Sequence, residues 1–374
     1  MVLLYIFGGN TLKFLKNIVA EETSYDEDIE NLSDVDKELL ELIQESKVKI
    51  TVVGCGGAGN NAINRLTIEG VKDAKTVAIN TDAQQLIKTK ADKKVLIGKN
   101  LTRGLGAGGD PTKGEESAKE NAEDIKRALQ DSDMVFITCG LGGGTGTGSA
   151  PIVAEISKKI GALTVAVVTL PFSMEGRVRM DNAISGLNKL KEAADTIVII
   201  PNDKLLEIVP NMPLRTAFKV ADEILINAVK GMIELVQNVG DIHVDFADVR
   251  AVMNDGGIAM IGIGESDSEK RAKEAISMAL NSPLLCVDVD GATGALIHIS
   301  GPEDMSLEEA KEIVSTVSSR LDENAKIIWG TTIDENNDNS LRVLLIITGT
   351  KSSGLSSKSK IDTKKFFLDE IPKI

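Results

Sequence analysis

The sequence predicts an α/β domain that is followed by a smaller α+β domain. Apolar strand patterns alternate with helix patterns between residues 48 and 200, which is typical of a parallel sheet with helices on both faces. Glycine-rich stretches stand between strand and helix patterns, as they do in Rossmann-like domains. Beyond residue 257, several strand patterns share the chain with two helix patterns, and this arrangement favours the α+β class.

The first 46 residues are predicted to form an acidic N-terminal extension, residues 1–46, outside these domains. Residues 21–30 are rich in acidic side chains, and Ser33 can cap a short helix that runs through Glu45. We expect a solvated segment that packs loosely on the main domain, in preference to a binding arm.

The first domain is expected at residues 47–212. Its predicted strands are 48–53, 75–79, 134–138, 162–169 and 196–200, and its predicted helices are 58–69, 114–129, 149–160 and 174–194. Ligands of such sheets bind at the carboxyl ends of the strands. The loops that follow the strands therefore form the candidate site.

A long helix is expected to connect the two domains. Residues 213–240 carry apolar side chains on several sides, which predicts a central helix buried between the domains. The C-terminal domain is expected at 241–350. Its elements are a loop and helix at 241–252, strands at 257–264, 285–289, 295–300, 326–332 and 341–348, and helices at 268–280 and 306–321. Residues 351–374, rich in Ser and Lys, are expected to form a flexible tail.

Composition excludes several classes of protein. A net charge of −14 over 374 residues argues against a nucleic-acid partner, because the phosphate backbone would repel the chain. No apolar run approaches the roughly 20 residues that span a bilayer, and the first residues lack the basic start of a signal peptide. Three scattered cysteines and two histidines predict neither a disulfide framework nor a protein-built metal site. We therefore expect a cytoplasmic protein.

The most informative stretch is the glycine-rich segment 140–148, GLGGGTGTG. It joins an apolar strand pattern to a helix pattern, so backbone amides and a helix N-terminus can surround an anion there. It lacks the Lys-Ser/Thr of a Walker loop, and its match to a dinucleotide fingerprint is weak because glycine is so frequent. A flexible linker is disfavoured because apolar patterns flank the segment on both sides. The segment is predicted to bind phosphate.

Further segments follow other strands of the first domain. Residues 54–61 and 104–111 are glycine-rich and precede helix patterns, and residues 80–82 offer polar side chains. Glu175 and Arg179 stand four residues apart just after a strand pattern. Their spacing fits an ordinary helix salt bridge and a contact with ribose or base about equally well.

Together these motifs resemble the FtsZ branch of the tubulin-type GTPases. Segment 140–148 resembles the tubulin-type phosphate signature, and residues 56–60, 106–109, 171–179 and 244–249 resemble the FtsZ pattern in the family's order. The resemblance implies a Rossmann-like GTP-binding domain, a central helix and a smaller α+β C-terminal domain. It further implies a cytoskeletal GTPase that binds GTP/GDP with Mg²⁺ held mainly through the nucleotide. Such a protein polymerises head to tail and forms the division ring at mid-cell.

The resemblance also implies which residues contact the nucleotide. The phosphate-facing and base-facing turn residues would be Gly56, Gly57, Ala58, Gly59, Asn60, Gly106, Ala107, Gly108, Gly109, Gly142, Gly143, Gly144, Thr145, Gly146 and Thr147. Glu175 would bind the ribose and Arg179 would lie near the nucleotide. Phe218 would stack on guanine, and Asp222 would accept from its N1–H and exocyclic amine. From the residues alone, Phe218 is better explained as a core aromatic.

Asp245 and Asp248 are the candidate catalytic residues. On spacing alone they are the cap and a first-turn acid of a helix. The resemblance implies instead that their loop enters the next subunit's site and orients water near the γ-phosphate. Two positions depart from the family pattern, because His243 and Asp110 both stand where asparagine is usual. The first bears on the rate of hydrolysis. The second adds a negative charge near the phosphates, which a cation would offset.

Two other functions remain open at this point. A dinucleotide oxidoreductase would use residues 54–59 as its fingerprint and Asp82 for the ribose, but it leaves segment 140–148 unexplained. A regulatory relative that does not polymerise would have no need of the two aspartates. Membrane-anchoring or regulatory division proteins are expected to bind the C-terminal tail, although it has no evident match to the usual bacterial partner peptide.

Overall fold

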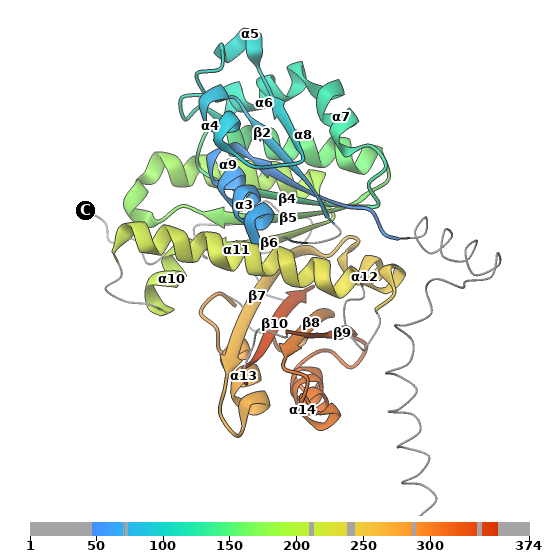
Figure 1. The fold of residues 1–374 in the computed structure, drawn as a ribbon. Helices are drawn as coiled ribbons and strands as arrows, with labels where there is room; N and C mark the ends of the chain where they lie inside the picture. Colours follow the sequence, from blue (N-terminus) through green and yellow to red (C-terminus); the bar gives the residue numbers. More distant parts are fainter. Residues whose placement is uncertain are drawn as a thin grey trace, which may run out of the picture. The chain divides into compact units, whose positions relative to one another are not determined.

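A single sheet organises most of the chain in the computed structural model (Figure 1). The structure describes residues 47–69, 71, 74–208, 213–237, 244–285, 289–334 and 339–350. The chain divides into two units, Met1–Lys47 and Val48–Ile374, and the second is described below. The predicted helix ending at Glu45, the tail 351–374 and His243 lie outside the described residues.

Among the described residues, ten strands form this sheet in the order β3-β2-β1-β4-β5-β6-β7-β10-β8-β9. The strands are β1 (Ile50–Cys55), β2 (Ala74–Asn80), β3 (Lys93–Leu96), β4 (Met134–Gly140), β5 (Leu163–Leu170), β6 (Thr196–Pro201), β7 (Gly257–Ser266), β8 (Gly294–Gly301), β9 (Lys326–Ile333) and β10 (Leu341–Thr348). The first six are all parallel, which confirms the α/β prediction for the first domain.

Strand β7 belongs to both halves of the sheet. Its first residues pair in parallel with β6, with Thr196 opposite Gly257. The rest of the strand pairs antiparallel with β10, from Met260 opposite Ile347 to Ser266 opposite Leu341. The predicted α+β domain is therefore joined to the first domain by backbone hydrogen bonds as well as by the central helix.

The helices cover both faces of the sheet. They are α3 (Gly56–Glu69), α4 (Ala83–Lys88), α5 (Lys99–Thr102), α6 (Pro111–Glu120), α7 (Ala122–Leu129), α8 (Thr145–Lys159), η3 (Ser173–Glu175), α9 (Arg177–Ala193), α10 (Asn202–Ile208), α11 (Leu214–Gln237), α12 (Phe246–Met253), α13 (Arg271–Leu280) and α14 (Leu307–Ser318). The predicted central helix is α11, and it lies between the two halves of the sheet (Figure 1).

Among the residues that the structure describes, two hydrophobic clusters form the core, one on each face of the sheet. Side chains of strand β5 alternate between the two faces of the sheet. Val165 and Val167 belong to the cluster that includes α3 and α11. Ala166 and Val168 belong to the cluster that includes α8 and α9. All eight residues of β5 are buried. This explains why a continuous apolar run, and not an alternating one, marks the strand in the sequence.

Several predicted elements differ from the observed ones. The helix expected at 114–129 is two helices, α6 and α7, which meet at Asn121, whose side chain accepts from the Gly98 amide at 2.9 Å. Strand β3 was not predicted, because Lys93 and Lys94 are exposed at the sheet edge.

The prediction of a strand at 285–289 is wrong at Leu285 and Val289, which do not belong to any strand. Leu285 and Val289 are buried but lie in turns, where the Leu285 amide donates to Ser282 and the Val289 carbonyl accepts from Ala292. Burial of an apolar pair from a loop produces the same sequence pattern as a short buried strand.

Candidate functional site

A cavity of about 250 Å³ opens where β1, β4, β5 and β6 end and α11 begins. It is lined by Cys55, Gly57, Ala58, Gly140, Leu141, Gly143, Gly144, Thr145, Gly146, Thr169, Pro171, Glu175, Arg179, Asn202, Phe218, Ala221 and Asp222. Ten of the residues predicted to contact the nucleotide are among them. The cavity lies at the carboxyl ends of parallel strands, where α/β proteins bind their ligands.

The predicted phosphate-binding segment forms one wall of the cavity. Helix α8 begins at Thr145, four residues earlier than expected, and its N-cap Gly144 makes no side-chain capping bond. The first amides of α8 therefore have no side-chain partner at this cap and face the cavity end of β4. A Cβ on Gly144 would come within 2.8 Å of the Asp110 amide, whereas one on Gly143 would meet nothing within 4 Å. Gly144 is fixed by packing, and Gly143 leaves room for a ligand.

The two threonines of this segment have different positions. Thr145 lines the cavity, and its hydroxyl bonds the Thr81 hydroxyl at 2.7 Å. Thr147 is buried, and its hydroxyl accepts from the Gly142 amide at 2.9 Å. Gly142 has a φ of 101°, a conformation in which side chains are strained. Thr147 therefore stabilises the turn at Gly142 through this hydrogen bond, and it does not line the cavity.

The first glycine-rich turn packs directly against the second. Gly56 has a φ of 69°, and a Cβ there would lie 2.7 Å from the Gly146 amide nitrogen. Only glycine lets the two turns approach so closely. Gly57 and Ala58 reach the cavity wall, whereas Asn60 is buried beneath the turn.

Four other predicted side chains line the same cavity. Arg179 forms an ion pair with Glu175, and the second oxygen of Glu175 accepts from the Phe172 amide at 2.9 Å. The expected helix salt bridge is thus present, and both side chains also line the cavity. Phe218 and Asp222 line it from α11, one helical turn apart.

Asp222 is the acidic group on α11 in this cavity wall. Burial raises the pKa of its carboxyl to about 6, the nearby charge of Arg65 lowers it, and Glu223 raises it. At neutral pH the group is an acceptor that has lost part of its hydration. Such a group gains from two N–H donors that approach it together.

Sequence reasoning missed Asn202. This residue is the first of α10, directly after β6, and its buried side-chain oxygen has no hydrogen-bond partner. It also lines the cavity. This acceptor can therefore take a hydrogen bond from a donor in the cavity. The rule that ligands bind after strand ends could have identified it, because the predicted strand ended at residue 200.

The remaining predicted residues do not reach the cavity wall. Residues 106–109 form a loop in which Gly106, Gly108 and Gly109 have positive φ, and Gly108 and Gly109 are exposed. The loop packs against Gly144, because a Cβ added to Gly144 would lie 2.9 Å from the Ala107 side chain. Asp110 caps α6 and accepts from the Thr112 amide at 2.9 Å. Its extra negative charge is therefore placed at a helix N-terminus, where it is stabilised.

Asp245 and Asp248 lie at the far end of the central helix from this cavity. Asp245 caps α12 and accepts from the Ala247 amide at 3.0 Å, and Asp248 is in the first turn. The structure thus shows the capping arrangement, and both aspartates are exposed. Residues near the start of α11 line the cavity, and α12 follows the other end of that helix (Figure 1).

The fold and this site define a tubulin-type GTPase, and family comparison agrees. Residues 49–210 match the model described as "Tubulin/FtsZ family, GTPase domain", and residues 257–351 match "FtsZ family, C-terminal domain". The chain belongs to the FtsZ family of cell-division proteins, and it is a GTPase that binds GTP and GDP.

Individual relatives are similar over almost the whole chain. The chain is 72% identical to Cell division protein FtsZ 1 of Methanocaldococcus jannaschii over 97% of this chain and 100% of the relative. It is 60% identical to the Thermococcus kodakarensis protein of the same name over 87% of each. The solved structure titled "FtsZ dimer, empty (M. jannaschii)" has 74% identity and a TM-score of 0.84, and covers 92% of this chain and 100% of that one. These relatives are archaeal proteins.

The oxidoreductase alternative has no support in this site. Asp82, which would bind the ribose, caps α4 and accepts from the Gln85 amide at 3.0 Å. It does not line the cavity. Among the described helices, none combines the length and apolar character that a membrane crossing requires.

Proposed function

We propose that this GTPase polymerises head to tail into filaments, and that Asp245 and Asp248 of one subunit complete the nucleotide site of the next. The observation that carries the proposal is the separation of the two groups within one chain. Asp222 and the end of α11 at Gln237 are fifteen residues apart on one helix, or about 22 Å at 1.5 Å per residue. The aspartates follow that end, so one chain does not bring them to its own phosphates.

A head-to-tail contact would bring the aspartates of one subunit to the nucleotide cavity of the next. Such an interface joins two different surfaces, so it extends into an open filament when its rotation does not close. The M. jannaschii relative with 74% identity has a solved structure whose title names a dimer. By similarity to the cell-division relatives, we infer a cytoplasmic filament at the mid-cell division site, with anchoring or regulatory proteins bound through the tail 351–374.

The cavity supports a specific orientation of GTP. The amides at the start of α8 and the Thr145 hydroxyl would hold phosphate oxygens, with Gly143 leaving room for them. Glu175 would bind the ribose, with Arg179 beside it. Phe218 and Asp222 would bind guanine, because a carboxylate matches the two adjacent donors of that base.

Mg²⁺ would be held mainly by the phosphates of the nucleotide. In the part of the chain that the structure describes, no three His, Cys, Asp or Glu side chains come together to bind a metal. The hydroxyl of Thr145 and the phosphate oxygens are hard oxygen donors of the kind that Mg²⁺ prefers. The bound ion would neutralise charge on the phosphates.

The aspartates would orient the attacking water. One oxygen of Asp245 is occupied by the Ala247 amide, which fixes the side chain and leaves the other oxygen free of that bond. Asp248 is one helical turn further, on the same exposed helix start. Phosphoryl transfer depends mainly on positioning and charge stabilisation, so a water-orienting carboxylate together with Mg²⁺ would suffice for this role.

Dilution tests the proposal. GTP turnover per subunit should rise with protein concentration and follow light scattering, because the complete site needs two subunits. Nucleotide binding per subunit should stay constant over the same range, which serves as the control. Turnover that is constant down to nanomolar protein would contradict a shared site.

A further inference from the structure

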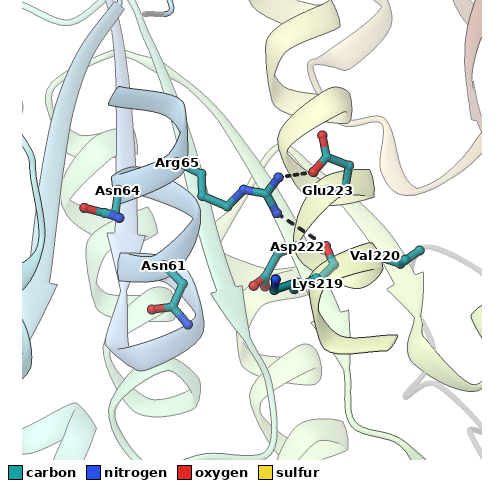
Figure 2. Close-up of a pocket in the computed structure, with 7 residues that line it drawn as sticks. All are labelled: Asn61, Asn64, Arg65, Lys219, Val220, Asp222 and Glu223. Carbon is teal, nitrogen blue, oxygen red and sulfur yellow. Dashed lines mark hydrogen bonds and ion pairs between the residues drawn. The ribbon is translucent and has the colours of Figure 1, made fainter. Parts of the chain in front are cut away.

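A second cavity lies behind Asp222, between α3 and α11 (Figure 2). Its volume is about 780 Å³, and its walls carry Asn61 and Arg65 from α3 and Lys219, Asp222 and Glu223 from α11. Asp222 lines both this cavity and the nucleotide cavity. A side chain that acts on Asp222 from this side therefore acts on the wall of the nucleotide site.

Arg65 crosses this cavity from one helix to the other. Its guanidinium forms an ion pair with the Glu223 carboxylate and donates to the Lys219 carbonyl at 3.5 Å, as Figure 2 shows. A third, longer contact of 3.8 Å reaches Glu69 on its own helix. The two acceptors on α11 lie four residues apart and flank Asp222 in sequence. A planar fork with several donors can reach both of them, whereas a lysine has a single point of charge.

The charges around Asp222 are of both signs. Arg65 on α3 favours its ionised form, and Glu223 on α11 disfavours it. Lys219 lines the same second cavity, between α3 and α11. Glu175 on η3 and Arg179 on α9 line the nucleotide cavity, where they form an ion pair with each other. Arg65 is therefore the positive group that opposes the effect of burial on this carboxylate.

We propose that Arg65 is a positioning residue for base recognition: by binding the Lys219 carbonyl and Glu223, it holds the turn of α11 that presents Asp222 to the 2-amino group of guanine. The inference rests on the proposed role of Asp222. It adds that selectivity among purine nucleotides depends on a residue of α3 that does not line the nucleotide cavity. A protonated carboxyl has one acceptor fewer than a carboxylate. Because Arg65 favours the ionised form of Asp222, loss of its charge should raise the pH above which the carboxylate can accept from the base.

The test compares GDP with IDP, which differ only in the 2-amino group of the base. Calorimetry on the full chain between pH 5 and pH 8 gives the ratio of the two affinities. A change in the phosphate or ribose contacts affects GDP and IDP equally and leaves this ratio unchanged. The parent should prefer GDP by roughly tenfold or more above its pH midpoint. Arg65→Gln should lower the preference several-fold near pH 6.5 and move the midpoint to higher pH. Arg65→Lys should keep the midpoint near that of the parent.

Glu223→Gln is the matched control. It breaks the same ion pair but removes a negative charge, so its midpoint should not rise. If Arg65→Gln and Glu223→Gln both raise the midpoint, or if neither Arg65 variant alters the ratio, Arg65 has only a packing role and the inference is wrong. If Arg65→Gln loses both nucleotides, Arg65→Lys decides the question. A lower GDP preference at a parent-like midpoint supports the inference, because one ammonium group cannot hold both acceptors, whereas a parent-like preference contradicts it. The role of Asp222 is tested separately, because Asp222→Asn should abolish the preference even if Arg65 has no part in it.

Discussion

Phe172 and Phe218 meet edge to face, with ring centroids 5.2 Å apart and ring planes at 90°. Phe172 follows β5 and is buried, whereas Phe218 is on α11 and 39% exposed. The pair joins the end of a strand to the start of the central helix at the nucleotide cavity. Edge-to-face packing fixes the orientation of the exposed ring, whose free face is then available to a planar base.

Phe218→Leu should weaken GDP binding by roughly three- to tenfold, because a stacking contact of this kind is worth about 0.5–1.5 kcal/mol. Stability should change little, since the ring is partly exposed. Phe172→Leu is the control, because it alters a buried ring and should lower the free energy of unfolding by about 1–2 kcal/mol. Calorimetry and denaturant titration check the two effects. Equal GDP affinity in Phe218→Leu and the parent would contradict stacking on Phe218.

Asp222→Asn should change which base is bound. An amide donates to the C2 carbonyl of xanthine and accepts from its N1–H, but it opposes the 2-amino group of guanine with a donor. GDP affinity should fall by roughly one to two orders of magnitude, and XDP affinity should rise. Competition between the two nucleotides measures the exchange. An unchanged GDP-to-XDP ratio would show that Asp222 does not read the base.

Thr147→Val should weaken all nucleotides alike. Valine has the shape of threonine but cannot accept from the Gly142 amide, which would be left buried without this partner. The cost is about 1–3 kcal/mol, mostly in the conformation of the phosphate-binding turn. GDP and IDP affinities should drop by the same factor, and the hydroxyl-retaining Thr147→Ser should recover most of the loss. Parent-like affinity in Thr147→Val would show that nucleotide binding does not depend on the hydrogen bond between Thr147 and the Gly142 amide.

A buried histidine should make stability depend on pH at the contact between α11 and the C-terminal strands. His298 on β8 bonds the Thr332 hydroxyl at 2.8 Å and lies 3.6 Å from the Glu234 carboxylate. Burial, with Lys230 and Arg342 nearby, lowers its pKa to about 4. The unfolded chain then binds the extra proton first, so stability is full above about pH 6.5 and is lost as the pH falls towards 4.

The loss from His298 should approach about 3 kcal/mol at the acid end. His298→Gln should flatten this part of the profile in denaturant titrations at pH 4.5 and 7. Burial raises the pKa of Glu234, which gives a slope of the opposite sign. Glu234→Gln should therefore steepen the acid loss. A parent profile with no such loss, or one that His298→Gln leaves unchanged, would contradict the assignment.

The sequence predicted the sheet because parallel strands buried on both faces are continuous apolar runs, as in β5. It missed β3, where exposed Lys93 and Lys94 conceal an edge strand. It could not predict that β7 joins both halves, because pairing partners are not encoded in the pattern of one strand. These differences all concern long-range pairing or burial.

Prediction of the site had a similar limit. The glycine-rich turns were visible because their spacing and flanking patterns are local. Which hydroxyl faces the cavity, Thr145 or Thr147, depends on where α8 begins, and the helix pattern placed that start four residues too late. Asn202 was overlooked although it directly follows a predicted strand end. The contact of Arg65 with Glu223 could not be predicted, because the two residues are distant in sequence.

The most direct test of a shared active site is complementation between two inactive variants. One variant, Asp245→Ala with Asp248→Ala, keeps its nucleotide cavity, and the other, Asp222→Ala, keeps its aspartates but binds GTP weakly. Each alone should show little turnover at a GTP concentration that saturates only the first. An equal mixture should recover roughly a quarter of the parent turnover, because one random head-to-tail junction in four joins a sound cavity to sound aspartates. A mixture that only averages the two separate rates would contradict the account.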